Sequence, residues 1–149
     1  MHVIETHQSI DATPGQVWEV LSDLERYREW NPVIVAVEGK AAVGERIAFR
    51  MLVPGGGESR HSPVITEAAP ERSLCWEGTV GAAWLARAVH EFRLTPSGAG
   101  TALTHKETFT GLLVPFAKGT LKRTEQGFHD MNRALKELVE SRAAAGERP

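Results

Sequence analysis

Two histidines and one glutamate are the side chains of this sequence most able to do chemistry. His90 lies in the segment 85–95, and His105 and Glu107 lie in the segment 101–110. Both segments alternate apolar and polar residues, which is typical of β-strands, and a glycine-containing turn separates them. We therefore expect an antiparallel hairpin that brings the three side chains together on one face.

The register of this hairpin has two possible values. In the first, Leu94 lies opposite Leu103. His90 then faces Glu107. In the second, shifted by two residues, His90 faces His105 and Glu107 is diagonal to it. Both registers keep the three side chains within cross-strand reach.

Three interpretations of this cluster are open. It can be a buried polar network that satisfies its own hydrogen bonds. It can be a set of polar anchors that orients a ligand in an apolar pocket. Alternatively, Glu107 with His90 or His105 can act as a catalytic acid/base pair, as cyclisation and dehydration of a polyketone require. Two imidazoles and a carboxylate can also hold zinc or iron, but this spacing is not a ligand motif, so we expect no metal.

Two other features suggest chemistry less strongly. Cys75 alternates with Leu74 and Trp76, so it should face away from His90 and be a passive thiol rather than a nucleophile. The glycines at 55–57 lack the lysine and the helix that a phosphate-binding loop needs. We interpret them as a flexible hairpin tip at a cavity mouth.

The cluster needs a sheet and a helix to position it. A first strand is expected over 3–10. Thr13 and Gln16 have the spacing of a capping box around Pro14, which predicts a short helix over 14–22. Asp23 can cap a second short helix that ends at 30–32. Turn signals then recur about every ten residues and predict six more strands, at 33–40, 45–53, 60–68, 72–79, 85–95 and 101–110.

A long amphipathic helix ends the chain. Its apolar stripe consists of Leu121, Phe128, Met131, Leu135 and Leu138. Pro115, Gly119 and Gly127 predict a kinked or segmented helix. This helix is the only large element available to cover the apolar face of the sheet. The expected fold is α+β: a seven-stranded curved antiparallel sheet wrapped around the C-terminal helix in one domain, 1–143, with a frayed tail, 144–149.

Strand alternation indicates which side chains face the enclosed cavity. Trp84 follows Gly81 in a loop that can sit at the entrance, and the helix stripe should pack on the core rather than on a membrane. The predicted ligand contacts are Trp30, Phe49, Met51, His61, Ile65, Trp76, Trp84, His90, Phe92, Leu103, His105, Glu107, Phe109, Phe128 and Met131.

Composition limits the classes of partner. The 149 residues suit one domain, and 42% hydrophobic with 24% charged residues is typical of a folded chain. A net charge of −2 gives no reason to expect nucleic acid or an anionic membrane, and no segment approaches a membrane span. The N-terminal segment carries Glu5 where a signal peptide would be apolar, so we expect a cytoplasmic protein.

Several segments together resemble a known superfamily. Residues 10–14 and 17–23, Tyr27 and Trp30-Asn31-Pro32 resemble the opening of SRPBCC proteins, the START-like and Bet v 1-like superfamily that includes the polyketide cyclase/dehydrase group. Residues 70–76, 90–94, 100–101 and 107–111 match the same pattern. The resemblance implies a helix-grip fold around an apolar cavity, with no cofactor. Known members include lipid carriers, aromatase/cyclases, hormone receptors and co-chaperone domains.

Three functions follow as hypotheses. The first is binding of a small hydrophobic ligand, aromatic or polyketide- or lipid-like, in the cavity by a monomer or homodimer. The second is a polyketide cyclase or dehydratase that uses Glu107 with His90 or His105. The third is a co-chaperone-like module that binds proteins through its surface.

Overall fold

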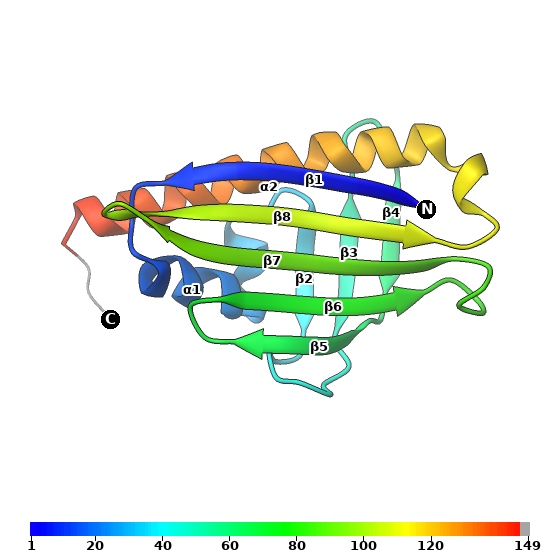
Figure 1. Ribbon diagram of the computed structural model, residues 1–149, viewed down its shortest axis with the longest axis horizontal. Coiled ribbons are helices and arrows are strands. Elements are labelled where there is room, and N and C mark those ends of the chain that lie inside the picture. Colours follow the sequence, from blue (N-terminus) through cyan, green and yellow to red (C-terminus); the bar gives the residue numbers. More distant parts are fainter. Residues whose placement is uncertain (147–149) are drawn as a thin grey trace.

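The computed structural model describes residues 1–146. Figure 1 shows a curved antiparallel sheet wrapped around one long helix, which confirms the predicted α+β helix-grip fold. The elements in chain order are β1 (His2–Ile10), α1 (Pro14–Ser22), η1 (Leu24–Glu29), β2 (Ile34–Glu38), β3 (Ala48–Leu52), β4 (Glu58–His61), β5 (Val64–Ala69), β6 (Ser73–Thr79), β7 (Arg87–Ser97), β8 (Gly100–Thr110), η2 (Val114–Phe116) and α2 (Lys118–Ala144).

The sheet has two parts, ordered β1-β8-β7-β6-β5 and β2-β3-β4. A bridge between Arg46 and Val64 joins them, beside a hydrogen bond of 2.9 Å from Ile47 N to Pro63 O. The single strand expected over 60–68 is divided into β4 and β5. The chain leaves β3 and joins β6 at this point, and Pro63 has no N–H to continue the ladder. Residues 1–146 therefore contain eight strands rather than the expected seven.

The two short helices differ in how they begin. α1 has the predicted capping box, with Gln16 N donating to Thr13 Oγ1 at 3.2 Å and Thr13 N to Gln16 Oε1 at 2.9 Å. The second is a 3₁₀ helix, η1, and the expected Asp23 cap was wrong, because its side chain makes no capping hydrogen bond. Asp23 has ψ 74°, outside the extended conformation that an N-cap residue usually adopts.

The long helix α2 is continuous from Lys118 to Ala144, so the expected segmentation was wrong. Pro115 lies before it in η2. Gly127 allows close packing instead of a break, since a Cβ there would lie 3.1 Å from Val33 Cγ2. The predicted tail began at 144, but Ala144 still belongs to the helix and residues 145 and 146 cap it. Residues 147–149 of that tail lie outside the described residues.

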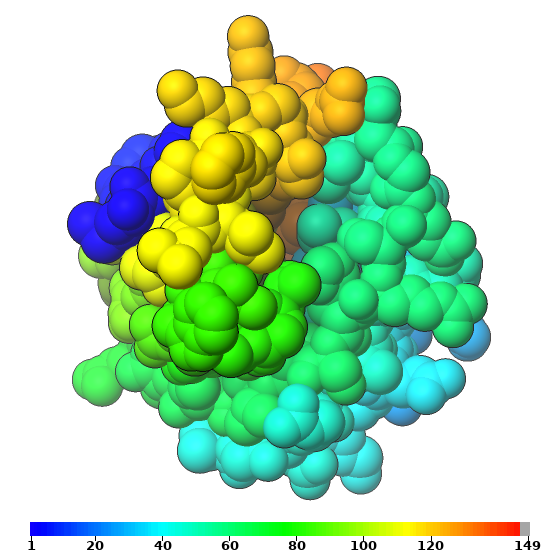
Figure 2. Space-filling model, turned by 90° about the vertical axis from the view of Figure 1, so that its right-hand side faces the viewer, coloured from blue at the N-terminus to red at the C-terminus, as the bar shows by residue number. Residues whose placement is uncertain are grey.

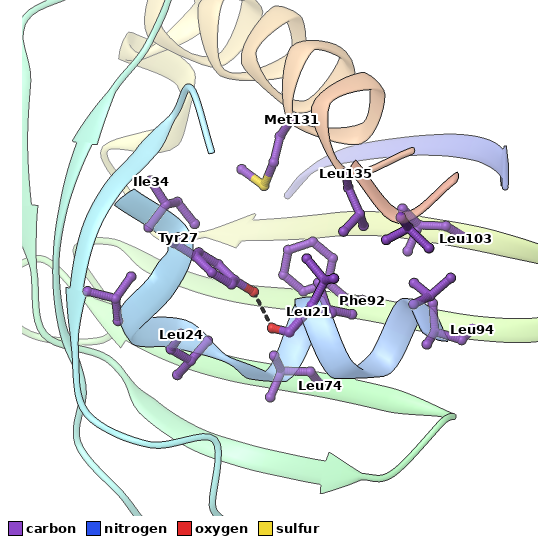
Figure 3. Packing of buried hydrophobic residues seen from close by; sticks show 14 of the residues in the cluster. Leu21, Leu24, Tyr27, Ile34, Leu74, Phe92, Leu94, Leu103, Met131 and Leu135 are labelled. Carbon is purple, nitrogen blue, oxygen red and sulfur yellow. Dashed lines mark hydrogen bonds between the residues drawn. The ribbon is translucent and has the colours of Figure 1, made fainter. Parts of the chain in front are cut away.

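The core fills the end of the grip at which α1 and η1 lie (Figure 3). Tyr27 is fully buried there, and its hydroxyl donates to Leu21 O at 2.5 Å. Each large side chain buried in this way stabilises the fold by about 1.5–3 kcal/mol. The cluster joins residues of α1 and η1 to both the sheet and α2: Leu21, Leu24, Tyr27, Ile34, Leu74, Phe92, Leu94, Leu103, Met131 and Leu135. This end therefore consists of the protein's own side chains.

Candidate functional site

The hairpin of β7 and β8 has the first of the two predicted registers. Leu94 pairs with Leu103, and His90 pairs with Glu107. His105 lies opposite Phe92, one pair further from the open ends of the strands. The expectation that His90, His105 and Glu107 are neighbours on one face is confirmed.

The two histidines belong to a longer series of neighbouring polar side chains, which we call the polar chain: Glu107, His90, His105, Asn132 and Thr6. His90 Nε2 lies 2.8 Å from His105 Nε2, and His105 Nδ1 lies 2.7 Å from Asn132 Oδ1. Asn132 Nδ2 donates to Thr6 Oγ1 at 2.8 Å. Thr6 Oγ1 donates in turn to the backbone oxygen of His105 at 3.1 Å. The polar chain thus connects β7 and β8 to α2 and β1 through hydrogen bonds.

The direction of these hydrogen bonds determines where the protons lie. Because the Thr6 hydroxyl proton is committed to a carbonyl, Thr6 Oγ1 accepts from Asn132, and the amide oxygen of Asn132 must face His105. His105 therefore carries its proton on Nδ1. A neutral His105 then accepts at Nε2, so His90 donates from its own Nε2.

His105 is enclosed on every side. Its ring stacks on Phe128 at 3.9 Å between centroids and on Phe92 at 4.3 Å. Burial lowers the pKa of His105 well below its usual value, and the neighbouring His90 lowers it further. The ring is therefore neutral over the physiological range, as the proton assignment requires.

Glu107 ends the polar chain with its hydrogen-bonding capacity unused. Its Oε2 lies 3.5 Å from His90 Nδ1, beyond hydrogen-bond distance, although its side chain is only 14% exposed. No described residue donates a hydrogen bond to this carboxyl group. With Nε2 of His90 protonated, the facing Nδ1 carries either a lone pair or a second proton. A proton on either Nδ1 or the carboxyl group would allow a hydrogen bond between His90 and Glu107.

Aromatic rings form the wall beside this pair. Trp76 stacks on His90 with centroids 4.5 Å apart, and Phe49 stacks on His61 at 5.2 Å. His61 is half-buried and accepts or donates at 2.8 Å with Ser59 Oγ. Burial lowers the pKa of His61, while the charge of Glu107 opposes that shift. The described side chains therefore place a carboxyl group near two imidazoles, those of His90 and His61, among aromatic rings.

The grip is open at the end opposite the core. Figure 2 looks at this end and shows a hollow between the loop 80–86, the segment 111–117 with the start of α2, and the hairpin 53–57. His90 lies three residues after the start of β7, and Glu107 lies three residues before the end of β8. Both are therefore about 10 Å from this end of the sheet.

The remaining predicted contacts fall into three groups. Ile65, Phe92, Leu103, Phe128 and Met131 are fully buried in the structure. A ligand could reach them only by displacing packed side chains, so the structure gives them a core role. Whether they also contact a ligand stays a prediction.

A second group lies near the opening. Met51 and Phe109 are partly buried, and Phe109 pairs across the sheet with Ala88 and His2. Trp84 is 65% exposed in the loop 80–86, at the entrance as expected. The glycine-rich hairpin tip also borders the opening, since a Cβ on Gly55 would lie 3.7 Å from Arg123 Nε.

Trp30 stands apart from the polar chain. It packs edge-on against Tyr27 with centroids 5.0 Å apart, beside the apolar core. Its indole Nε1 is buried without a hydrogen-bond partner among residues 1–146. Its packing therefore places it with the core rather than with His90 and Glu107.

Asn132 and Thr6 are the site residues that the sequence reasoning missed. Asn132 lies on the apolar stripe of α2, four residues after Phe128 and three before Leu135. Thr6 shares the inner face of β1 with Ile4. A polar residue at an apolar position was the available signal in both cases.

Cys75 faces away from the polar chain, as expected. Its thiol donates to Glu67 Oε2 at 3.2 Å on the outer face of the sheet. Burial, and then this hydrogen bond, raise the pKa of Cys75 to about 12. The thiolate needed for nucleophilic chemistry is therefore disfavoured.

The outer face of β2-β3-β4 has a separate hollow of about 500 Å³. Its lining consists of residues of these three strands and of Ser62: Ala36, Glu38, Ala48, Phe49, Arg50, Arg60, His61 and Ser62. Arg50 is already paired with Glu58 at 2.8 Å. This hollow is shallow and lies on the opposite side of the sheet from the polar chain, so we assign the candidate site to the inner face.

Two properties of the described residues bear on the type of site. Within residues 1–146, no group of three or more histidine, cysteine, aspartate or glutamate side chains is arranged to hold a metal ion. None of the helices in that part of the chain is both long enough and apolar enough to cross a membrane.

Comparison with known proteins identifies the family. The family model described as polyketide cyclase/dehydrase and lipid transport matches residues 1–140. The chain belongs to this family. A search of curated proteins gave no significant match. The SRPBCC resemblance seen in the sequence is thus confirmed at the level of the family.

Solved structures share this fold at low sequence identity. Protein MLL2253 from Mesorhizobium loti is 21% identical with a TM-score of 0.75, covering 94% of this chain and 98% of that one. TTHA0849 from Thermus thermophilus is 20% identical with a TM-score of 0.74, covering 98% and 100%. The di-domain ARO/CYC StfQ from the steffimycin biosynthetic pathway is 17% identical with a TM-score of 0.72, covering 95% of this chain and 52% of that one. At these identities the likeness concerns the fold alone.

Proposed function

We propose that this family member binds a small, mainly apolar molecule at the open end of the grip and that Glu107 and His90 hold a polar group of that molecule. One observation carries the proposal: the Glu107 side chain is only 14% exposed, yet its carboxyl group receives no hydrogen bond from residues 1–146. Buried carboxyl groups are nearly always hydrogen-bonded in folded proteins. A ligand hydroxyl would supply the missing donor.

The surrounding wall suggests the class of ligand. The nearly buried rings of Trp76 and Phe49 lie beside the pair, and the half-buried His61 adds a third planar ring. Stacked rings favour flat, conjugated ligands. A hydroxylated aromatic or polyketide-like compound fits both features, because its ring system meets the wall and its hydroxyl meets the carboxyl group. The family description, with its polyketide and lipid members, supports this choice.

Acid/base catalysis is the second candidate, and the polar chain favours it. His90 donates from Nε2 to His105, so only its Nδ1 and the Glu107 carboxyl group can exchange a proton with a bound molecule. Such a pair can remove a proton from a carbon beside a ketone and return it to a departing hydroxyl group. The atoms for cyclisation or dehydration of a polyketone would then all come from the ligand and this pair.

Ligand binding can be tested with two matched compounds, a hydroxylated anthraquinone and unsubstituted anthraquinone. A hydrogen bond to a charged group contributes about 1.5–3 kcal/mol, so the hydroxylated compound should bind about tenfold or more tightly. Glu107→Leu should abolish that preference. Glu107→Gln retains an acceptor and should change affinity only a few fold, and Glu91→Gln, on the outer face of β7, is the control.

Mass spectrometry of the native protein should show a copurifying compound of the same class. If no compound copurifies and neither probe binds, the binding proposal fails and the protein-interaction hypothesis becomes the stronger one. Catalysis predicts a different result for Glu107→Gln: binding is retained while turnover of a polyketone substrate falls by a hundredfold or more.

A further inference from the structure

Large apolar side chains gather beside the hollow and face solvent. Nine such side chains are exposed among residues 1–146, and five of them lie in the two adjacent segments 80–86 and 111–117. We call these five the rim patch: Val80, Trp84, Leu112, Leu113 and Phe116. Phe116 is 86% exposed and Trp84 is 65% exposed. Single exposed apolar residues are common, but a contiguous group of this kind marks an interaction surface.

The two segments of the rim patch are held together by the backbone. Leu112 N donates to Trp84 O at 3.1 Å, and Leu113 N donates to Leu85 O at 3.0 Å. Gly111 makes this contact possible, because a Cβ there would lie 2.3 Å from Leu85 O. Figure 2 shows the segments side by side at the edge of the hollow, in green and yellow. The apolar side chains are therefore displayed by a defined structure.

Positive charge accompanies the rim patch. Lys118, Lys122 and Arg123 lie in the first two turns of α2, and no acidic residue occurs between Glu107 and Glu125 or between Glu77 and Glu91. None of these three cations has an ion pair within residues 1–146. Lys118 at the start of α2 opposes the helix dipole, so helix stability does not explain it. The net charge of −2 conceals this local excess.

We propose that the rim patch docks on the surface of an anionic lipid bilayer. Tryptophan and phenylalanine at the tips of loops enter the interfacial layer, while lysine and arginine beside them meet lipid phosphates. A second copy of the chain fits less well. A symmetric dimer through this patch would bring the same cations of both copies together.

Docking in this way would bring the open end of the grip to the lipid. An apolar molecule could then pass between the bilayer and the hollow with little exposure to water. This inference does not depend on the proposed function, because the rim patch would bind the bilayer whether or not the hollow holds a ligand.

The test is flotation of the full chain with vesicles of phosphatidylcholine alone and of phosphatidylcholine mixed with phosphatidylglycerol. The second readout is the change in tryptophan fluorescence on vesicle addition that Trp84→Phe removes. We expect binding to the mixed vesicles that weakens with salt. Phe116→Ser should weaken it by about tenfold or more. The matched control is Val43→Ser, since Val43 is 68% exposed but lies outside the patch, in the loop before β3. Lys118→Glu with Lys122→Glu should abolish the preference for anionic lipid.

Two results would overturn the proposal. One is a folded chain that does not float with the mixed vesicles, or that binds both kinds of vesicle equally and independently of salt. The other is a concentration-dependent dimer that Phe116→Ser dissociates, which would make the patch a contact between copies. Failure of the anthraquinone experiment would leave vesicle binding intact, so the two proposals fail separately.

Discussion

Replacing Asn132 with leucine tests the proton assignment of the polar chain. Leucine has the same branched skeleton of four side-chain heavy atoms as asparagine, with bulkier methyl groups, so the change removes polar groups without creating a cavity. It deletes the acceptor 2.7 Å from His105 Nδ1 and the donor 2.8 Å from Thr6 Oγ1. Asn132, His105 and Thr6 are all buried, so water cannot replace either partner without the core opening.

The size of the effect follows from the groups left unpaired. A buried donor without an acceptor costs about 1–3 kcal/mol, and the gain from burying the leucine side chain offsets part of this. His105 can avoid the cost by moving its proton to Nε2. His90 would then accept at Nε2 and carry its proton on Nδ1, facing Glu107. We therefore expect both histidines to exchange tautomers and the free energy of unfolding to fall by about 1–2 kcal/mol.

Nitrogen-15 NMR of the imidazole rings distinguishes protonated from unprotonated ring nitrogens, and urea unfolding at pH 8 gives the free energy. In the parent protein, His105 should be protonated at Nδ1 and His90 at Nε2. Gln126→Leu is the control, because it removes an exposed amide from the same helix and should change stability by no more than about 0.5 kcal/mol. A parent His105 protonated at Nε2, or an Asn132→Leu protein with unchanged tautomers and unchanged stability, would refute the reasoning.

Two further predictions concern stability. Burial lowers the pKa of His105 in the folded state, so the unfolded chain binds a proton at this residue at a higher pH than the folded protein does. The stability that neutral His105 permits is therefore present above about pH 6.5 and is lost as the pH falls. The free energy of unfolding should fall by up to about 1.4 kcal/mol per pH unit. Unfolding measured between pH 8 and 5 should show a shallower slope for His105→Phe and no change for the exposed His7→Gln; equal slopes in all three proteins would contradict this. Gly111→Ala should destabilise by about 2 kcal/mol or more, since its φ is +120° and the new Cβ would meet Leu85 O. Thermal unfolding should show this loss. The control is Gly119→Ala, which should be neutral or slightly stabilising because no atom lies within 4 Å of the added Cβ. A Gly111→Ala protein as stable as the parent would show that the rim segments are not held as described.

Much of the fold could be predicted from local patterns. The capping box at Thr13 and Gln16 and the alternation along β7 and β8 depend on residues close in sequence. The one-strand expectation over 60–68 failed because a change of partner strand is a property of the whole sheet. The Asp23 cap failed because the type of a residue does not determine its backbone conformation.

The cluster of His90, His105 and Glu107 shows what the sequence could predict about the site and what required the folded structure. Sequence alone sufficed to place these side chains on a shared face, because alternation in a hairpin is a short-range rule. The folded structure was needed to show that Asn132 and Thr6, separated by 126 positions, meet behind His105 and orient its proton. It was also needed to show that Glu107 ends the polar chain without a hydrogen bond, near an open hollow. Those facts depend on how α2 packs across the sheet, and side chains distant in sequence determine that packing.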